Sequence, residues 1–363
     1  MKIGILTFHC AENYGAVLQC YATQEFLKSK GHEVHIIDYR PDYLLSPYRV
    51  FYLRRLLCRN PLNGVINLIK ELIHLPKRCY RRRAFHKFTQ QHLLLTDTVT
   101  RDTIPTTFES YVVGSDQIWN TKITEGLDDV YFCNFSFPKE KRRYVAYAAS
   151  MGKAELEDDK AKDYVCHALN HFDAISVREH DLSELLQPLT SRPISQVLDP
   201  TLMVNPQIWE KFVQSSLITR KYVAVYEVRM DKNVRRIAAD IAKQIGGEII
   251  FMDSWFSPNS NEHHKAVSPE NFVNVIKHAA CVVTTSFHGT AFSVIFNRPF
   301  YTIRLNDGAD ARSQSLLETL HLEERMVDKH STPTYSSIDY TNANTILKTL
   351  RDQSQEFLQK ALE

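Results

Sequence analysis

The sequence lacks the cysteine patterns of metal-binding and disulfide-bonded proteins. Its 363 residues include seven cysteines, which are scattered, odd in number and never spaced as Cys-x-x-Cys. This distribution predicts no zinc site and no disulfide framework. We therefore expect reduced thiols and a cytoplasmic location.

Long apolar runs are also missing. No stretch approaches the roughly 18 apolar residues of a membrane-spanning helix. The apolar run of residues 2–8 turns polar at His9, which makes it too short for the core of a signal peptide. Any contact with a membrane is therefore expected to be peripheral, at its inner face.

Glycine is scarce, with 11 residues in the whole chain. The loop of residues 8–15 follows the first expected strand and lacks the three spaced glycines of a dinucleotide-binding fingerprint. A nicotinamide or flavin is therefore disfavoured, and the sequence predicts neither a cofactor nor a metal.

Neither sign of charge dominates the chain. The formal net charge of +2 gives no general signal for nucleic-acid binding, and we predict no nucleic-acid partner. Residues 49–87, however, contain eleven basic residues and one acidic residue, interleaved with apolar residues. The spacing predicts amphipathic helices that are broken near Pro61 and Pro76.

Two interpretations of residues 49–87 stay open. The basic residues, with Arg81-Arg82-Arg83 as their densest cluster, could lie on an anionic membrane surface. The alternative is an ordinary helical insertion that packs on the sheet and exposes its arginines to water.

What the chain does contain is a regular alternation of strands and helices. Strands are expected at residues 2–8, 33–39, 108–114, 143–149, 174–179, 222–228, 248–252, 281–285 and 300–304. Helices are expected at residues 13–30, 158–172, 233–245, 269–280, 291–296, 312–321 and 342–362. This alternation predicts an α/β fold with parallel sheets covered on both faces.

The length of the chain favours two domains of ordinary size. We predict a first domain over residues 1–205, with a basic helical insertion at about 49–92. A second domain follows over residues 206–345. The C-terminal helix of residues 346–363 has no strand after it, and a return to the first domain is one option for it.

The stretch 281–300 contains the strongest candidate for chemistry. Cys281 to Thr285 is a buried type of strand, Ser286 to Thr290 is small and polar, and a helix follows until Pro299. His288 therefore lies at the carboxyl end of a strand, where open α/β sheets bind ligands. Gly289 allows a close backbone approach. The alternative is that His288 only caps the helix.

Other polar residues follow strand ends elsewhere in the chain. Asn13 faces the expected crevice or serves as a helix N-cap. Asp116 accepts a hydrogen bond from a sugar hydroxyl or caps a helix, and Trp119 stacks on a sugar ring or belongs to the core. Arg178 binds a phosphate or carboxylate, or forms an ion pair with Glu179.

Five blocks in chain order resemble the polysaccharide pyruvyl transferase family. They are Asn13-Tyr14-Gly15-Ala16, Gly114-Ser115-Asp116-Gln117-Ile118-Trp119-Asn120, Ser176-Val177-Arg178-Glu179, Asp199-Pro200-Thr201 and Ser286-Phe287-His288-Gly289. The resemblance implies two Rossmann-like domains that face a cleft, as in glycosyltransferases of the B type. It also implies transfer of pyruvate from phosphoenolpyruvate onto two hydroxyls of a sugar, which makes a cyclic ketal and releases phosphate.

By this resemblance, His288 is the candidate general acid and Arg178 the anchor for phosphoenolpyruvate. Asp116 orients or deprotonates the acceptor hydroxyl. The remaining residues expected to line the substrate site are Ser286, Phe287, Gly289, Asn13, Tyr14 and Trp119. The implied acceptor is a sugar of an exopolysaccharide or capsule intermediate, with a lipid-linked sugar as one option.

The sequence departs from the family at Ser286, where some members carry an arginine. If that arginine binds the donor, the charge must come from another residue here, and Arg304 and Arg312 are the candidates. Two alternatives to a pyruvyl transferase stay open. One is a nucleotide-sugar-dependent glycosyltransferase with the B-type fold, and the other is a non-catalytic scaffold of a glycan-assembly complex.

Overall fold

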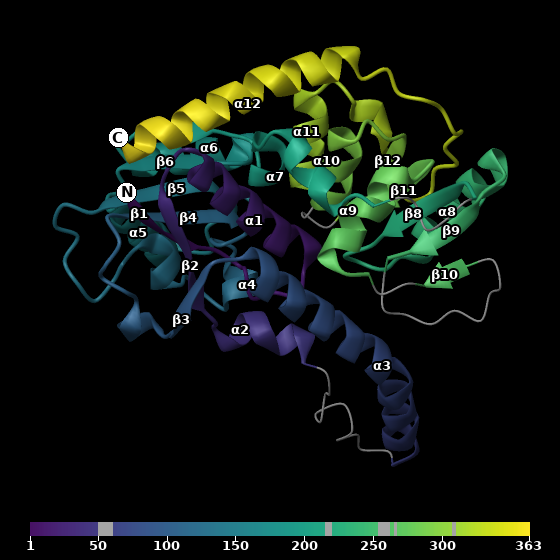
Figure 1. Cartoon of the computed structure of the whole chain (residues 1–363), viewed down its shortest axis with the longest axis horizontal. Coiled ribbons are helices and arrows are strands. Elements are labelled where there is room, and N and C mark those ends of the chain that lie inside the picture. The colour runs from purple at the N-terminus through teal and green to yellow at the C-terminus, as the bar shows by residue number, and fades with distance from the viewer. Residues whose placement is uncertain (50–60, 215–219, 253–261, 265–266, 307–309) are drawn as a thin grey trace.

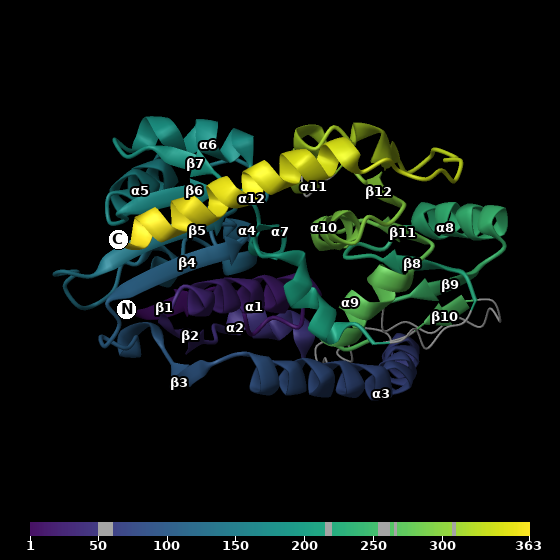
Figure 2. The same ribbon diagram turned by 45° about the horizontal axis from the view of Figure 1, so that its top comes forward.

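Two parallel β-sheets, both covered by helices, lie side by side in the protein (Figures 1 and 2). The computed structural model describes residues 1–49, 61–214, 220–252, 262–264, 267–306 and 310–363, with the backbone alone for 61–71 and 262–264. No helix in these ranges combines the length and the apolarity needed to cross a bilayer.

The first sheet has seven parallel strands in the described part of the chain, in the order β3-β2-β1-β4-β5-β6-β7. The strands are β1 (Lys2–Leu6), β2 (Glu33–Tyr39), β3 (Leu95–Val99), β4 (Ser110–Asp116), β5 (Arg143–Ala149), β6 (Ala174–Val177) and β7 (Ile194–Gln196). The helices are α1 (Tyr14–Ser29), α2 (Asp42–Leu45), α3 (Pro61–His92), α4 (Thr121–Thr124), α5 (Asp159–Leu169), α6 (His180–Leu186) and α7 (Pro200–Met203). The strand order reverses between β1 and β4, which is the point where doubly wound sheets bind ligands.

The second sheet repeats this arrangement with six parallel strands among the described residues, in the order β10-β9-β8-β11-β12-β13. The strands are β8 (Tyr222–Tyr226), β9 (Glu248–Phe251), β10 (Glu262–His264), β11 (Cys281–Thr284), β12 (Phe300–Arg304) and β13 (Met326–Asp328). The helices are α8 (Lys232–Ile245), α9 (Pro269–His278), α10 (Phe287–Ile295), α11 (Ala311–Thr319) and α12 (Thr341–Leu362). The order reverses between β8 and β11.

Short 3₁₀ helices occupy several connections. They are η1 (Ser46–Tyr48), η3 (Arg101–Thr103), η4 (Asp129–Phe132), η5 (Gln187–Leu189), η6 (Pro206–Phe212) and η7 (Glu323–Arg325). The η1 turn follows α2 directly, and the two together form the connection that begins after β2.

These sheets confirm the predicted α/β fold with parallel strands. Strands β2, β5 and β12 have the predicted bounds. Strands β5 and β12 are buried along almost their whole length, and such runs are a clear signal in sequence. Helix α8 also lies where it is expected, since Asp231 caps its start and Gly246, with φ 62°, ends it. The predicted domain boundaries stay a prediction.

Two expectations are wrong. The prediction starts the helix after β11 at Ala291, whereas α10 begins at Phe287, so His288 belongs to its first turn. Pro76 was expected to break the insertion, but it lies inside the single helix α3, which changes direction along its length (Figure 1). A bend absorbs the clash of the proline ring, because the proline removes only one helical hydrogen bond.

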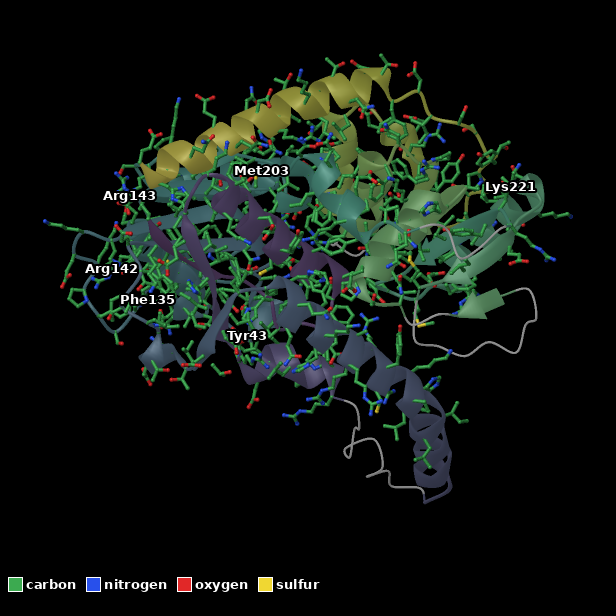
Figure 3. All side chains as sticks on the ribbon, in the orientation of Figure 1. Tyr43, Phe135, Arg142, Arg143, Met203 and Lys221 are labelled. Carbon is green, nitrogen blue, oxygen red and sulfur yellow. The ribbon has the colours of Figure 1, made fainter. Side chains whose placement is uncertain are left out.

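The two halves share one hydrophobic core. Tyr14 of α1 stacks on Phe272 of α9, with ring centroids 4.6 Å apart, and the same core extends from β1 to α12. Helix α12 runs across both halves (Figure 1). It lies over Met203, whose carbonyl oxygen accepts a hydrogen bond of 2.8 Å from Gln355 (Figure 3).

The packing of α12 on the shared core can be tested with a smaller side chain at Leu358, which is fully buried. We expect Leu358→Ala to lower the free energy of unfolding in urea by about 2–5 kcal/mol, because it leaves a cavity in the shared core. Lys348→Ala, at an exposed site on the same helix, is the matched control. Equal stability of the two variants would contradict this packing.

Candidate active site

A cavity of about 520 Å³ lies where the two reversal points face each other. The first half lines it with residues that follow β1, β2 and β4. The second half contributes residues 228–229 after β8 and 285–288 after β11, with Arg312 from α11. Both sheets therefore present their ligand-binding edges to one space, as the topology of open parallel sheets requires.

The first turn of α10 is held tightly against β11. Thr284 Oγ1 accepts a hydrogen bond from the backbone N–H of Ser286 at 3.0 Å and donates one to the carbonyl of Tyr226 at 2.6 Å. A Cβ atom on Gly289 would lie 2.2 Å from Thr284 Oγ1. Gly289 therefore permits the close approach that the sequence predicts, and it fixes the position of His288.

The imidazole of His288 lies at the contact between the two halves. Its side chain is 6% exposed, and its Nε2 is buried without a hydrogen-bond partner among the described residues. Gly15 of α1 lies directly against the ring, because a Cβ at that position would be 1.9 Å from His288 Nδ1. The first half therefore sets the orientation of a histidine that belongs to the second half.

Asp199 faces His288 from the N-cap of α7. Its Oδ2 lies 3.6 Å from His288 Nε2, which is longer than a hydrogen bond, so the contact is electrostatic. The same oxygen accepts a hydrogen bond of 2.7 Å from Arg178 Nη1. Burial by itself would raise the pKa of Asp199, but His288 and Arg178 lower it far below its ordinary value. Asp199 is therefore a buried carboxylate ion.

Arg178 is surrounded by carboxylates. Besides Asp199, its guanidinium lies 3.7 Å from Asp116 Oδ1 and 3.7 Å from Glu179 Oε1. Burial raises the pKa of Glu179. Arg178 does not line the large cavity but a smaller one of about 90 Å³ behind Phe287. The role of Arg178 as an anchor for the donor stays a prediction, and the structure places its guanidinium among three carboxylates beside the smaller cavity.

Arg312 is a half-buried cation that lines both cavities. Its guanidinium carbon lies 5.8 Å from the centroid of the Phe287 ring, and that of Arg178 lies 5.3 Å from the same centroid. Burial, and then the charge of Arg178, lower the pKa of Arg312 to about 10, so it stays protonated at neutral pH. Phe287 is thus an aromatic spacer between two cations.

The large cavity brings together six of the predicted site residues, which are His288, Ser286, Phe287, Asp116, Asn13 and Arg312. Asn13 is also the N-cap of α1, since its Oδ1 accepts a hydrogen bond from the N–H of Ala16 at 3.3 Å. Asp116 adopts φ 76°, a strained backbone for a residue with a side chain, and strain of this kind clusters at functional sites. Asn120, and not Asp116, caps the helix that follows.

Three predicted residues, Tyr14, Trp119 and Arg304, lie outside the lining of the large cavity. Tyr14 is fully buried against Phe272. Trp119 is 1% exposed, and its ring stacks on Phe132 as part of the core. Arg304, at the end of β12, lies outside the cavity lining. The aromatic residues fill the core because a large apolar ring gains more from full burial than from partial contact with solvent.

Sequence reasoning missed Asp199 and the cations Arg229 and Lys122, which line the cavity. Asp199 belongs to the block Asp199-Pro200-Thr201, which supports the family resemblance but by itself indicates no function for the carboxylate. Arg229 donates to Asp310 at 3.0 Å, and it follows β8 in a loop that carries no recognisable motif. In the described ranges, no group of three His, Cys, Asp or Glu side chains could hold a metal ion.

Several solved structures are similar to this chain at low identity. The UDP-N-acetylglucosamine 2-epimerase of Rickettsia bellii is 11% identical, with a TM-score of 0.47 over 100% of this chain and 97% of that chain. The UDP-GlcNAc 2-epimerase of Methanocaldococcus jannaschii is 13% identical, with a TM-score of 0.46 over 97% and 93%. The spinosyn rhamnosyltransferase SpnG is 11% identical, with a TM-score of 0.45 over 99% of both chains. Nothing about the substrate follows from similarity of this degree.

No curated protein matches the sequence of this chain. The family model described as polysaccharide pyruvyl transferase matches residues 13–307. The match covers most of the chain, and it begins at the cap of α1 and includes Asp116, Asp199 and His288. This chain therefore belongs to the polysaccharide pyruvyl transferase family.

Proposed function

We propose that this protein transfers pyruvate from phosphoenolpyruvate onto two hydroxyls of a sugar in a polysaccharide intermediate, forming a cyclic ketal and releasing phosphate. The observation that carries the proposal is the buried His288–Asp199 pair beside a cavity that both sheets line, in a chain of this family. The acceptor is a glycan sugar, and a lipid-linked sugar fits the same chemistry.

Binding of the donor requires cations, because phosphoenolpyruvate carries a phosphate and a carboxylate. Ser286 brings no charge, and Arg312, Arg229 and Lys122 all line the cavity. Of the two arginines expected to replace the missing charge, Arg312 has the position that supports this role. Its planar guanidinium can bind two oxygens of one oxyanion.

His288 supplies the proton for the first step. Transfer of its proton to C3 of the donor makes C2 electrophilic, and a sugar hydroxyl then attacks C2. The carboxylate of Asp199 lies 3.6 Å from His288 Nε2 and, together with Gly15 against the ring, supports a fixed orientation of the imidazole. Asp199 is therefore a positioning residue and His288 the catalytic acid.

The second hydroxyl closes the ring as the bond between C2 and the phosphate oxygen breaks. Each of the two acceptor hydroxyls loses one proton. One of these protons returns His288 to its protonated form, and the other leaves with the phosphate. Asp116 lines the cavity and is the carboxylate that accepts a proton or a hydrogen bond from the acceptor. The reaction is thus balanced without an oxidant or reductant.

A cytoplasmic location belongs to the same proposal. The cysteines in the described part of the chain are all free thiols, namely Cys10, Cys20, Cys79, Cys133, Cys166 and Cys281. Cys58 lies outside the described residues. Unpaired, largely buried cysteines fit a reducing compartment.

The first prediction concerns the acid. With phosphoenolpyruvate and a lipid-linked sugar, we expect His288→Ala to lower the rate of phosphate release by about 10²–10⁴-fold, the usual contribution of a positioned general acid. His180→Ala, at an exposed histidine, is the matched control. An unchanged rate in the His288 variant would overturn the assignment, and turnover of nucleotide sugars without phosphoenolpyruvate would favour a glycosyltransferase.

The second prediction concerns Gly15. We expect Gly15→Ala to lower kcat strongly, because the added Cβ displaces the His288 ring, while the protein still folds. Gly31→Ala, at the far end of α1, has nothing near the added Cβ. The control is expected to cost stability through its φ of 82° and to keep its activity. Similar rates for both variants would show that the histidine does not depend on this contact.

The third prediction concerns pH. Because the folded pKa of Asp199 is lowered, its contribution to stability is complete above about pH 4 and is lost as the pH falls. Asp199→Asn is expected to lower the free energy of unfolding by about 3–5 kcal/mol at pH 7, and by progressively less below about pH 4. Asp352→Asn, an exposed change on α12, is the control. A positioning role also requires kcat to fall while KM for the donor changes little.

A further inference from the structure

One face of α3 remains exposed on the described part of the chain. Residues 72, 73, 76, 80, 83 and 87 recur at helical spacing and are all exposed. We call this set, which consists of Leu72, Ile73, Pro76, Tyr80, Arg83 and Lys87, the docking face. Helix α3 lies at the periphery of the molecule in both ribbon views (Figures 1 and 2), and in Figure 1 its N-terminal part projects away from the body.

The opposite face of α3 fastens the helix to the protein. Phe85 and Phe88 are buried in the shared core. Arg81 stacks on the ring of Tyr14, with its guanidinium 4.9 Å from the ring centroid, and donates a hydrogen bond of 2.6 Å to the carbonyl of Glu12. Arg81 is therefore structural and cannot act with Arg82 and Arg83 as one surface cluster, which corrects the sequence-based expectation.

The docking face combines apolar and basic residues. Leu72, Ile73 and Tyr80 are 52%, 56% and 48% exposed, and they are three of the seven exposed large hydrophobic residues in the described part of the chain. Apart from the structural Arg81, residues 72–92 contain five lysines and arginines and no acidic residue, and Arg83 and Lys87 among them belong to the docking face. Exposed apolar side chains favour a bilayer over a nucleic acid, and the charge favours an anionic bilayer.

Helix α3 is close in sequence to residues that line the cavity, and it contacts a loop that leads into the cavity. Tyr43 in α2, which Figure 3 labels, and Ser46 to Tyr48 in η1 line the cavity and precede α3 in sequence. Arg81 contacts Glu12, one residue before Asn13 of the cavity. Helix α3 therefore contacts, through Arg81, the loop that carries Asn13 of the cavity lining.

We propose that the docking face binds the surface of a membrane that contains anionic lipids. Leu72, Ile73 and Tyr80 enter the headgroup boundary, and Arg83 and Lys87 contact lipid phosphates. Residues 50–60 of the basic segment lie outside the described residues. Where the acceptor is lipid-linked, a step that rests on the proposed function, docking raises its effective concentration at the cavity.

Co-sedimentation of the full chain with vesicles tests this proposal. Vesicles of phosphatidylglycerol and phosphatidylcholine are compared with vesicles of phosphatidylcholine alone. We expect binding to the anionic vesicles, and a loss of about fivefold per charge in Arg83→Gln/Lys87→Gln, equivalent to about 1 kcal/mol each. Lys160→Gln/Lys243→Gln removes two exposed charges elsewhere and is the matched control. Leu72→Ser/Ile73→Ser is expected to weaken binding even at moderate salt, because its effect is apolar.

Three outcomes would overturn the proposal. They are equal binding to both kinds of vesicle, equal losses in the Arg83/Lys87 variant and its control, and an unchanged affinity of the Leu72/Ile73 variant. A face that joins two copies of the chain would instead give a change of mass in light scattering on Leu72→Ser/Ile73→Ser, without vesicle binding. Phosphate release with a soluble sugar is measured in parallel. Binding without turnover supports docking and rejects the proposed reaction, whereas turnover without binding does the reverse.

Discussion

The buried carboxylate of Asp199 is the constraint on which the site depends. An ion without solvent is stable only when opposite charges surround it, and here Arg178 and His288 provide them from two other elements. The requirement fixes α7, the end of β6 and the start of α10 relative to one another. The same requirement brings the catalytic candidate of one sheet to the strand ends of the other sheet, so the charge balance and the geometry of the cavity have one origin.

Much of this arrangement follows from local signals in the sequence. Runs rich in apolar and β-branched or aromatic residues predict β5 and β12, and the small polar turn at residues 286–290 predicts that His288 lies at a strand end. These features are legible because each depends on residues that are close in sequence. For the same reason Asn13 is recognisable as a helix cap.

The remainder depends on contacts between distant residues. Trp119 and Tyr14 follow strand ends as ligand-binding residues do, but only the packing of Phe132 and Phe272 shows that their rings are covered. Arg178 has the chemistry of an anion site, yet the carboxylates around it come from positions 116, 179 and 199. Which carboxylates surround a buried arginine is decided by the folded structure, and a local sequence pattern does not predict it.

The core that extends from β1 to α12 has a consequence for the integrity of the molecule. One hydrophobic cluster includes residues of both sheets, and each half has a further cluster of its own. Unfolding of either half would expose the apolar side chains of the other half in the shared cluster, which favours coupled unfolding. Helix α12 belongs to the hydrophobic cluster that covers the first sheet. Loss of the buried side chains of α12, such as Leu358 and Leu362, would therefore weaken the packing of the first sheet as well as that of the helix.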